Sequence, residues 1–138
     1  MLITGAIHHI SLIVRDLDAC RHFYVEVLGL QEVARPASFK FAGACFRAGA
    51  AELHVIHSDD AAQAPGDAPV RTAPDRDATY ARHFCFQITE VDLLLATLRA
   101  HNIPIVVGPR PRGDGAVQTY ISDPDGHLVE LVYLGLKT

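Results

Sequence analysis

The stretch that decides the fold reads HISLIVRDLDACRHFYVEVLGL and spans residues 9–30. Its first six residues alternate as in a half-buried strand, and the apolar side chains that share one face are Ile10, Leu12 and Val14. Further on, apolar residues recur at three- and four-residue spacing, which predicts a helix. Asp16 can cap this helix at its start, and Gly29 suits the left-handed position beyond its end. Residues 9–30 are therefore expected to form a strand followed by a helix.

The same order of elements begins again at residue 83, where the sequence reads HFCFQI. From the opening histidine to the next acidic residue there are seven positions in both places, to Asp16 in the first and to Glu90 in the second. Each copy then runs to a Glu-Leu pair, at residues 52–53 and at residues 130–131. This self-similarity indicates a duplicated module.

Segments with strand-like alternation complete both modules. They are residues 39–42, 44–48 and 51–57 in the first and residues 105–107, 116–122 and 128–134 in the second. The turn sequence SDPDG at residues 122–126 predicts a hairpin between the last two strands. Thr89 with Asp92 resembles a capping box for the second helix, and Asn102 suits its left-handed C-terminal position. The repeated order βαβββ predicts an α+β fold whose modules pair their half-polar sheet faces around a central cleft.

The length of 138 residues is that of one domain. We expect a single domain with a first module over residues 5–58, a linker over 59–80 that is rich in Pro, Ala, Asp and Gly, and a second module over 81–135. Hydrophobic residues make up 49% of the chain and charged residues 20%, which excludes disorder over most of its length.

Charge and hydropathy narrow the class of partner. The net charge of −4 argues against nucleic acid and against an anionic membrane surface. No apolar run approaches the roughly 18 residues of a spanning helix, and the N-terminus lacks the pattern of a signal peptide. A cytoplasmic protein that binds a small molecule is the expectation. Cys20, Cys45 and Cys85 are too widely spaced for a disulfide framework and are expected to be buried free thiols.

Histidine and glutamate stand at matching positions of the two modules, His9 and Glu52 in the first and His83 and Glu130 in the second. A two-fold arrangement of the modules would bring these residues toward the central cleft. Two imidazoles with one or two carboxylates suit a divalent transition metal. His54 lies two residues after Glu52 on the same face of one strand, so either can complete the ligand set while the other orients it or accepts a proton. The repeat favours Glu52.

Other candidates are weaker. His8 faces away from His9 and is expected to pack near a helix, and the histidines expected in solvent are His22, His57, His101 and His127. No GxSxG, P-loop or strand-linked GxGxxG motif occurs, which removes the common serine hydrolase and nucleotide-binding classes.

The chain resembles the vicinal oxygen chelate superfamily, also called the glyoxalase/bleomycin resistance/dioxygenase group. The resemblance rests on HxxLxVxDL at residues 9–17, FYxxVLGL at 23–30, His83 at the start of the second half and DPDGxxxEL at 123–131. It implies two βαβββ modules that curl into an incomplete barrel around a metal, and it implies a homodimer. It also implies that the family's four ligand positions fall on His9, Glu52, His83 and Glu130.

Within this superfamily the chain is similar to the short glyoxalase I-like, or lactoylglutathione lyase-like, proteins. The resemblance implies a metal-dependent lyase or isomerase that binds two neighbouring oxygens of a small substrate on one Zn, Ni, Co, Mn or Fe ion. Glu130 or Glu52 would take a C–H proton and return it to the adjacent carbon through a metal-stabilised enediolate. Three alternatives stay open. They are an Fe(II) extradiol-type dioxygenase that uses His9, His83 and Glu130, a non-catalytic drug-binding protein of the bleomycin resistance type, and a fosfomycin-modifying transferase.

Overall fold

The computed structural model describes residues 1–2, 4–58 and 78–135. The chain divides into two compact units, Met1–Asp67 and Ala68–Thr138. The boundary falls in the predicted linker, of which residues 59–77 lie outside the described part of the chain and Ala78–Tyr80 form a 3-10 turn, η4. Each unit holds one of the two predicted modules.

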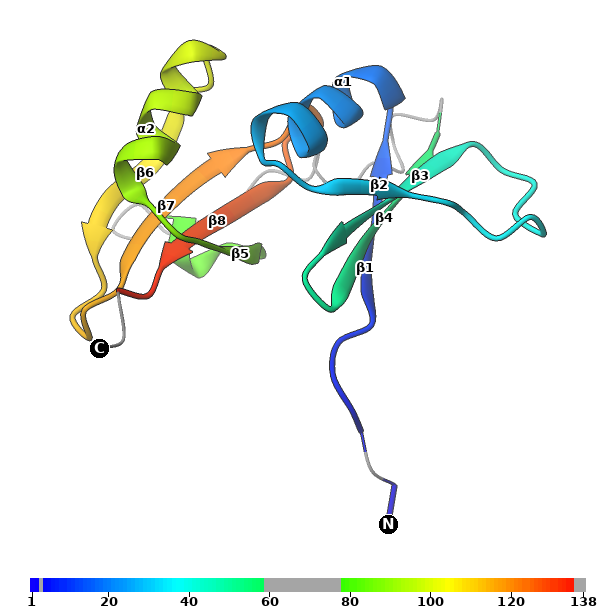
Figure 1. Ribbon diagram of the computed structural model, residues 1–138, viewed down its shortest axis with the longest axis horizontal. Coiled ribbons are helices and arrows are strands. Elements are labelled where there is room, and N and C mark those ends of the chain that lie inside the picture. The colour runs from blue at the N-terminus through cyan, green and yellow to red at the C-terminus, as the bar shows by residue number, and fades with distance from the viewer. Residues whose placement is uncertain (3, 59–77, 136–138) are drawn as a thin grey trace. The chain divides into compact units, whose positions relative to one another are not determined.

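The first unit follows the predicted order βαβββ. Its elements are β1 (His9–Val14), α1 (Leu17–Arg21), the π-helical turn η1 (His22–Val27), β2 (Gln31–Val33), β3 (Gly43–Ala48) and β4 (Ala51–His57). The strands form one sheet in the order β1-β4-β3-β2, in which β1 runs parallel to β4 and the other neighbours are antiparallel (Figure 1).

The strand predicted over residues 39–42 is wrong, because the edge strand of this sheet is β2. Phe39 and Phe41 instead stack on each other with ring centroids 5.1 Å apart, and the Arg35 guanidinium lies 4.8 Å from the Phe41 centroid. Arg35 also donates from Nη2 to the carbonyl oxygen of Phe41 at 2.7 Å. The alternating aromatic residues thus reflect a local cation–aromatic contact and not strand pairing.

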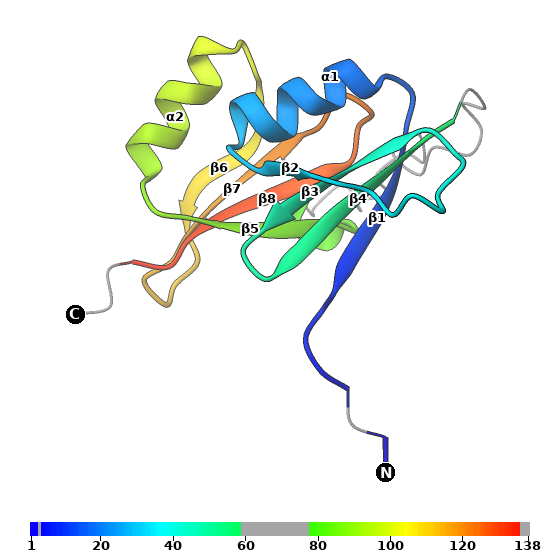
Figure 2. The same ribbon diagram turned by 45° about the vertical axis from the view of Figure 1, so that its right-hand side comes forward.

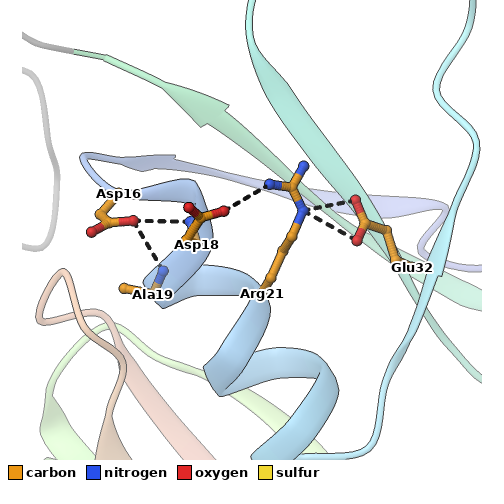
Figure 3. A network of polar contacts seen from close by, with 5 residues as sticks. All are labelled: Asp16, Asp18, Ala19, Arg21 and Glu32. Carbon is orange, nitrogen blue, oxygen red and sulfur yellow. Dashed lines mark hydrogen bonds and ion pairs between the residues drawn. The ribbon is translucent and has the colours of Figure 1, made fainter.

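Asp16 caps the first helix as predicted. Its Oδ1 accepts hydrogen bonds from the backbone N–H groups of Asp18 at 2.9 Å and Ala19 at 3.0 Å (Figure 3). Further along the helix, Arg21 donates from Nε to both carboxylate oxygens of Glu32, at 3.1 and 3.2 Å. These contacts set the start of the helix and join it to β2.

The predicted glycine ends the helical stretch, with Gly29 at φ +75°. On the apolar side of that stretch, Tyr24 stacks on Phe46 of β3 with ring centroids 5.8 Å apart, and both residues are fully buried. Leu53 and Val55 of β4 lie on the same face of the sheet as Phe46 and are also buried. The helix therefore covers this apolar face, which leaves the opposite, polar face for a site.

The second unit repeats the order of elements. It contains β5 (Phe84–Ile88), α2 (Val91–Ala100), β6 (Ile105–Pro111), β7 (Val117–Ser122) and β8 (Leu128–Tyr133). The sheet order is β5-β8-β7-β6, with β5 parallel to β8 and the other neighbours antiparallel. Helix α2 lies along one face of this sheet (Figure 2). Its buried residues are Leu94 and Leu98.

One of the two signals predicted for the ends of α2 is confirmed. Asn102 adopts φ +55°, the left-handed conformation expected beyond the helix C-terminus. The capping box of Thr89 and Asp92 is wrong, because the N-cap residue is Glu90 and its side chain makes no capping hydrogen bond. With the helix starting one residue later, Leu93 occupies the position where the box needs an acidic or amide side chain.

The predicted turn between β7 and β8 is present and polar. Asp123 Oδ1 accepts the N–H groups of Asp125 at 2.9 Å and His127 at 2.8 Å, and Gly126 adopts φ +83°. The expectation of a solvated His127 is wrong, since the residue is only 7% exposed. Its backbone carbonyl accepts the Asp123 N–H at 2.9 Å, which draws it into the closed turn.

Two mixed four-stranded sheets with few helices confirm the predicted α+β fold class of two βαβββ modules. Among the residues that the structure describes, no helix is long and apolar enough to cross a membrane.

Candidate functional site

The polar face of the first sheet gathers the three site residues predicted for this module. His9 of β1 pairs with Glu52 of β4 in the parallel ladder, so both side chains lie on the face opposite the core. His54 Nε2 lies 2.8 Å from Glu52 Oε2. The His54 ring stacks on the His9 ring, with centroids 4.2 Å apart and planes 10° apart. The first module thus presents two imidazoles and one carboxylate in direct contact.

Glu52 is held ionised by its neighbours. The hydrogen bond with His54 is the largest cause that lowers the pKa of the Glu52 carboxyl, and Arg47 acts in the same direction from 3.5 Å. The carboxylate side chain is 24% exposed, so a cation or a small substrate can reach it.

The second module brings His83 and Glu130 together. His83 Nε2 lies 3.1 Å from Glu130 Oε2, and His83 Nδ1 lies 2.7 Å from the carbonyl oxygen of Ala81. A carbonyl oxygen only accepts, so Nδ1 carries a proton and Nε2 is the ring nitrogen that faces the carboxylate. An imidazole nitrogen beside a carboxylate oxygen suits a bound cation, and a metal-binding histidine commonly donates its other N–H to a backbone carbonyl. The donor set therefore fits a divalent metal.

Gln118 contacts the Glu130 carboxylate, and no sequence pattern predicted it. Its Nε2 donates to Glu130 Oε1 at 2.8 Å and lies 3.3 Å from the Tyr120 hydroxyl oxygen. Glu130 is nearly buried, with 9% of its side chain exposed, so these contacts set which oxygen faces His83. No spacing rule pointed to Gln118, because it reaches Glu130 across the β7–β8 ladder.

An aromatic ring supports the His83 imidazole. Tyr120 is fully buried, and its ring meets the His83 ring edge to face at a centroid distance of 5.2 Å. Burial raises the pKa of the Tyr120 hydroxyl, which keeps it protonated. The Arg110 guanidinium lies 5.9 Å from the same ring and donates to the Thr79 hydroxyl oxygen.

Strand register refines the comparison of the two modules. From His9 to the first residue of α1 the chain advances eight positions, and from His83 to the first residue of α2 it also advances eight. Glu52 lies directly opposite His9, whereas the β5–β8 register, extended by one residue before Phe84, places His83 opposite Leu128, two positions before Glu130. When the two histidines are matched, the counterpart of Glu130 is therefore His54. Each lies diagonal to its histidine and contacts it.

Two expectations near the site are wrong. His8 does not pack near a helix, because it precedes β1 and is exposed, with Nδ1 2.8 Å from Nδ1 of His9. Cys85 is exposed, unlike the buried free thiols Cys20 and Cys45, because it lies on the polar face of β5 opposite Glu130. Partial desolvation of the sulfur, and then the negative charge of Glu130, raise the pKa of the Cys85 thiol to about 12. A thiol with so high a pKa is mostly protonated at neutral pH, which disfavours a nucleophilic role for Cys85.

The sequence pattern of the Glyoxalase/Bleomycin resistance protein/Dioxygenase superfamily matches residues 6–131. This chain belongs to that superfamily. The match spans both modules and includes all five predicted site residues, His9, Glu52, His54, His83 and Glu130.

Several named proteins are similar to this chain. "Glyoxylase I 4" of Arabidopsis thaliana is 28% identical over 127 residues, which cover 91% of this chain and 69% of the relative. The Escherichia coli protein YaeR is 28% identical over 137 residues, covering 95% and 98%. "Glutathione transferase FosA" of Serratia marcescens is 29% identical over 126 residues, covering 91% and 79%.

Solved structures of the superfamily have the same fold. A glyoxalase family protein from Bacillus anthracis matches with a TM-score of 0.72 and 20% identity, over 96% of this chain and 98% of that chain. The fosfomycin resistance protein FosX from Listeria monocytogenes matches with a TM-score of 0.69 and 25% identity, over 99% and 94%. Members of this superfamily act on small molecules and typically use a divalent metal.

Proposed function

We propose that this chain is a metal-dependent lyase or isomerase of the glyoxalase I type, which acts on a small substrate with two neighbouring oxygens. The observation that carries the proposal is the pair of His83 and Glu130. A nearly buried carboxylate, fixed by Gln118, faces an imidazole nitrogen whose ring is already oriented by a backbone carbonyl. Similarity to "Glyoxylase I 4" supports this choice of chemistry.

The proposed metal ligands are His9, His83 and Glu130, with a further ligand from β4. When His9 is aligned with His83, His54 occupies the position that corresponds to Glu130, which favours His54 as this further ligand. Glu52 then lies beside His54 as a hydrogen-bonded anion. Imidazole and carboxylate ligands suit Zn, Ni, Co, Mn and Fe.

When bound, the metal supplies Lewis-acid charge that stabilises a negative oxygen of the substrate. The chain itself supplies the proton acceptor, and Glu130 and Glu52 are the two carboxylates available. Removal of a C–H proton by one of them, and return of that proton to the adjacent carbon, gives a net isomerisation. His54 orients Glu52, and Gln118 orients Glu130, so each carboxylate has one fixed oxygen.

The test is turnover of methylglyoxal with glutathione, followed by the thioester absorbance, after the protein is stripped of metal and reloaded with Zn, Ni, Co, Mn or Fe. We expect activity with at least one ion, and none in the stripped protein. His83→Ala should lose it, whereas His101→Ala, a histidine beyond the end of α2, should keep it. Failure of every ion with the wild type would contradict the proposal.

Fosfomycin modification is the second candidate, and the similarity to FosA and FosX favours it. The same five metal-loaded samples are incubated with fosfomycin, with and without glutathione, and the products are identified by mass spectrometry. A fosfomycin adduct or hydrolysis product without methylglyoxal turnover would move the assignment to this class. Ring cleavage of a catechol with Fe(II) and O2, or tight ligand binding without metal, would indicate a dioxygenase or a drug-binding protein.

Gln118→Leu should weaken metal binding by about 10- to 100-fold, the usual effect of removing a group that orients a ligand. The leucine fills similar space but cannot donate to Glu130 Oε1. Calorimetric titration of Zn measures the affinity. Gln87→Leu is the matched control, because Gln87 is an exposed glutamine on the same face of the sheet. Equal affinity in Gln118→Leu and the wild type would show that Glu130 needs no positioning.

The predicted homodimer and cytoplasmic location stay predictions. Sedimentation velocity of the purified protein measures the first, and cell fractionation measures the second.

A further inference from the structure

A guanidinium group is held in place where the first sheet meets the loop between β2 and β3. Arg35 donates from Nη2 to the carbonyl oxygen of Phe41 at 2.7 Å. Its guanidinium carbon lies 4.8 Å from the centroid of the Phe41 ring and 5.6 Å from that of the Phe39 ring. These contacts fix the cation without neutralising it, because a carbonyl group and two aromatic rings carry no net charge.

The charge of Arg35 is not paired within the part of the chain that the structure describes. Arg21, Arg47 and Arg112 each form an ion pair with a glutamate or an aspartate, at 3.1, 3.5 and 2.6 Å. No described carboxylate forms such a pair with Arg35. A guanidinium has five N–H donors, so most of those of Arg35 can meet an anion from outside the chain.

Strand register relates Arg35 to the polar face that holds the candidate site of the first module. Val33 of β2 lies opposite Cys45 of β3, and Cys45 lies opposite His54 of β4. These three side chains therefore share one face of the sheet. Arg35 follows Val33 by two positions, just beyond the end of β2.

Two further observations place the guanidinium near this face. A Cβ atom built on Gly43, the first residue of β3, would lie 3.4 Å from Arg35 Nη2. The charge of Arg35 also lowers the pKa of the Cys45 thiol, against the larger and opposite effects of burial and of Glu52. Gly43 precedes Cys45 by two positions, a distance of about 7 Å along a strand. A small substrate bound beside His54 can span that distance and reach Arg35.

A purely local role does not account for this arrangement. Phe39 and Phe41 are 39% and 45% exposed, so they form no core that Arg35 needs to cover. A cation–aromatic contact at an exposed site contributes little to stability. An oriented guanidinium is well suited to a carboxylate, because its planar set of donors can form two parallel hydrogen bonds to the two oxygens.

We propose that Arg35 is a specificity-determining residue that binds a carboxylate of the substrate, at the end of the polar face beyond His54. This inference rests on the proposed function and deepens it, because it narrows the substrate to a small anion. Phe39 and Phe41 orient the guanidinium, and no bond is made or broken at Arg35.

A pair of substrates that differ only in charge tests the inference. The hemithioacetals of methylglyoxal with 3-mercaptopropionate and with 3-mercaptopropionamide have similar shapes, but only the first carries a carboxylate. We expect the KM of the metal-loaded wild type to be at least about 10-fold lower for the carboxylate substrate, the scale of one hydrogen bond to a charged group. The two kcat values should be similar, because Arg35 does not contact the reacting atoms.

Arg35→Gln should raise the KM for the carboxylate substrate to that for the amide substrate. Arg99→Gln is the matched control, since Arg99 is an exposed arginine in the last turn of α2, and it should keep the preference. Equal KM values for the two substrates in the wild type, or a retained preference in Arg35→Gln, would overturn the inference.

A binding measurement separates this inference from the proposed function. Benzoate and benzamide are titrated into the metal-free full chain and followed by NMR, which requires neither turnover nor a variant that folds. The wild type should bind benzoate at least about 10-fold more tightly than benzamide. Equal binding of the two would overturn the inference. Selective benzoate binding without turnover of either hemithioacetal would contradict only the proposed function, whereas turnover without a carboxylate preference would contradict only the role of Arg35.

Discussion

Glu130→Gln will lower kcat/KM of the proposed reaction by at least about 10²-fold, the scale of losing one group that stabilises developing charge. The amide is nearly isosteric and its oxygen can still accept the hydrogen bond from Gln118 Nε2. What the variant loses is the negative charge opposite His83 Nε2, which the proposal assigns to metal binding. Metal content per chain and kcat/KM, measured on the same sample, check the prediction.

The stability of Glu130→Gln provides a control for folding. The carboxylate is nearly buried, and an amide in its place removes the cost of keeping a charge out of water. We therefore expect the melting temperature of the metal-free variant to equal or exceed that of the metal-free wild type. Glu90→Gln, a change at an N-cap whose side chain makes no capping bond, should keep full activity. Full metal content and full activity in Glu130→Gln would remove this residue from the site.

Asp123→Ala will reduce the free energy of unfolding by about 2–6 kcal/mol, because two buried backbone N–H groups lose their acceptor and each costs about 1–3 kcal/mol. These groups belong to Asp125 and His127, which both donate to Asp123 Oδ1. Urea unfolding of the metal-free protein measures the change. The turn leads directly into β8, so its loss also disturbs the strand that carries Glu130.

Asp123→Asn is the matched control for the turn. The asparagine keeps Oδ1 as an acceptor for both N–H groups, so we expect it to retain most of the stability that Asp123→Ala loses. A loss below about 1 kcal/mol in Asp123→Ala, the size of an ordinary single hydrogen bond, would show that the turn is held by its other contacts.

Local chemistry explains why much of the fold could be predicted. Asp16 caps a helix through its own neighbours in the chain, and Gly29 and Asn102 adopt the left-handed conformations that end helical stretches. The turn at residues 122–126 is likewise closed by Asp123 and residues no more than four positions away. Such signals involve residues only a few positions apart, so they can be recognised in a short stretch of sequence.

The strand error over residues 39–42 has the opposite origin. Alternating aromatic residues look like a strand, but a strand needs a neighbour with free hydrogen-bonding groups. In this sheet β2 already pairs with the outer edge of β3, where Val33 lies opposite Cys45. Residues 39–42 therefore have no edge of β3 to pair with. Arg35 then organises Phe39 and Phe41 outside the sheet.

The residues of the candidate site also fall into two groups, those that could be predicted from the sequence and those that depend on the pairing of strands. The sequence by itself determined that His54 and Glu52 share one face, because side chains two apart on a strand point the same way. It also determined the two opening histidines, through the repeat. Only the tertiary structure decided that His54 occupies the position that corresponds to Glu130 and that Gln118 contacts Glu130, because those neighbours depend on the register between strands. Register is set by hydrogen bonds and side-chain packing between segments distant in the chain, and no local pattern specifies it.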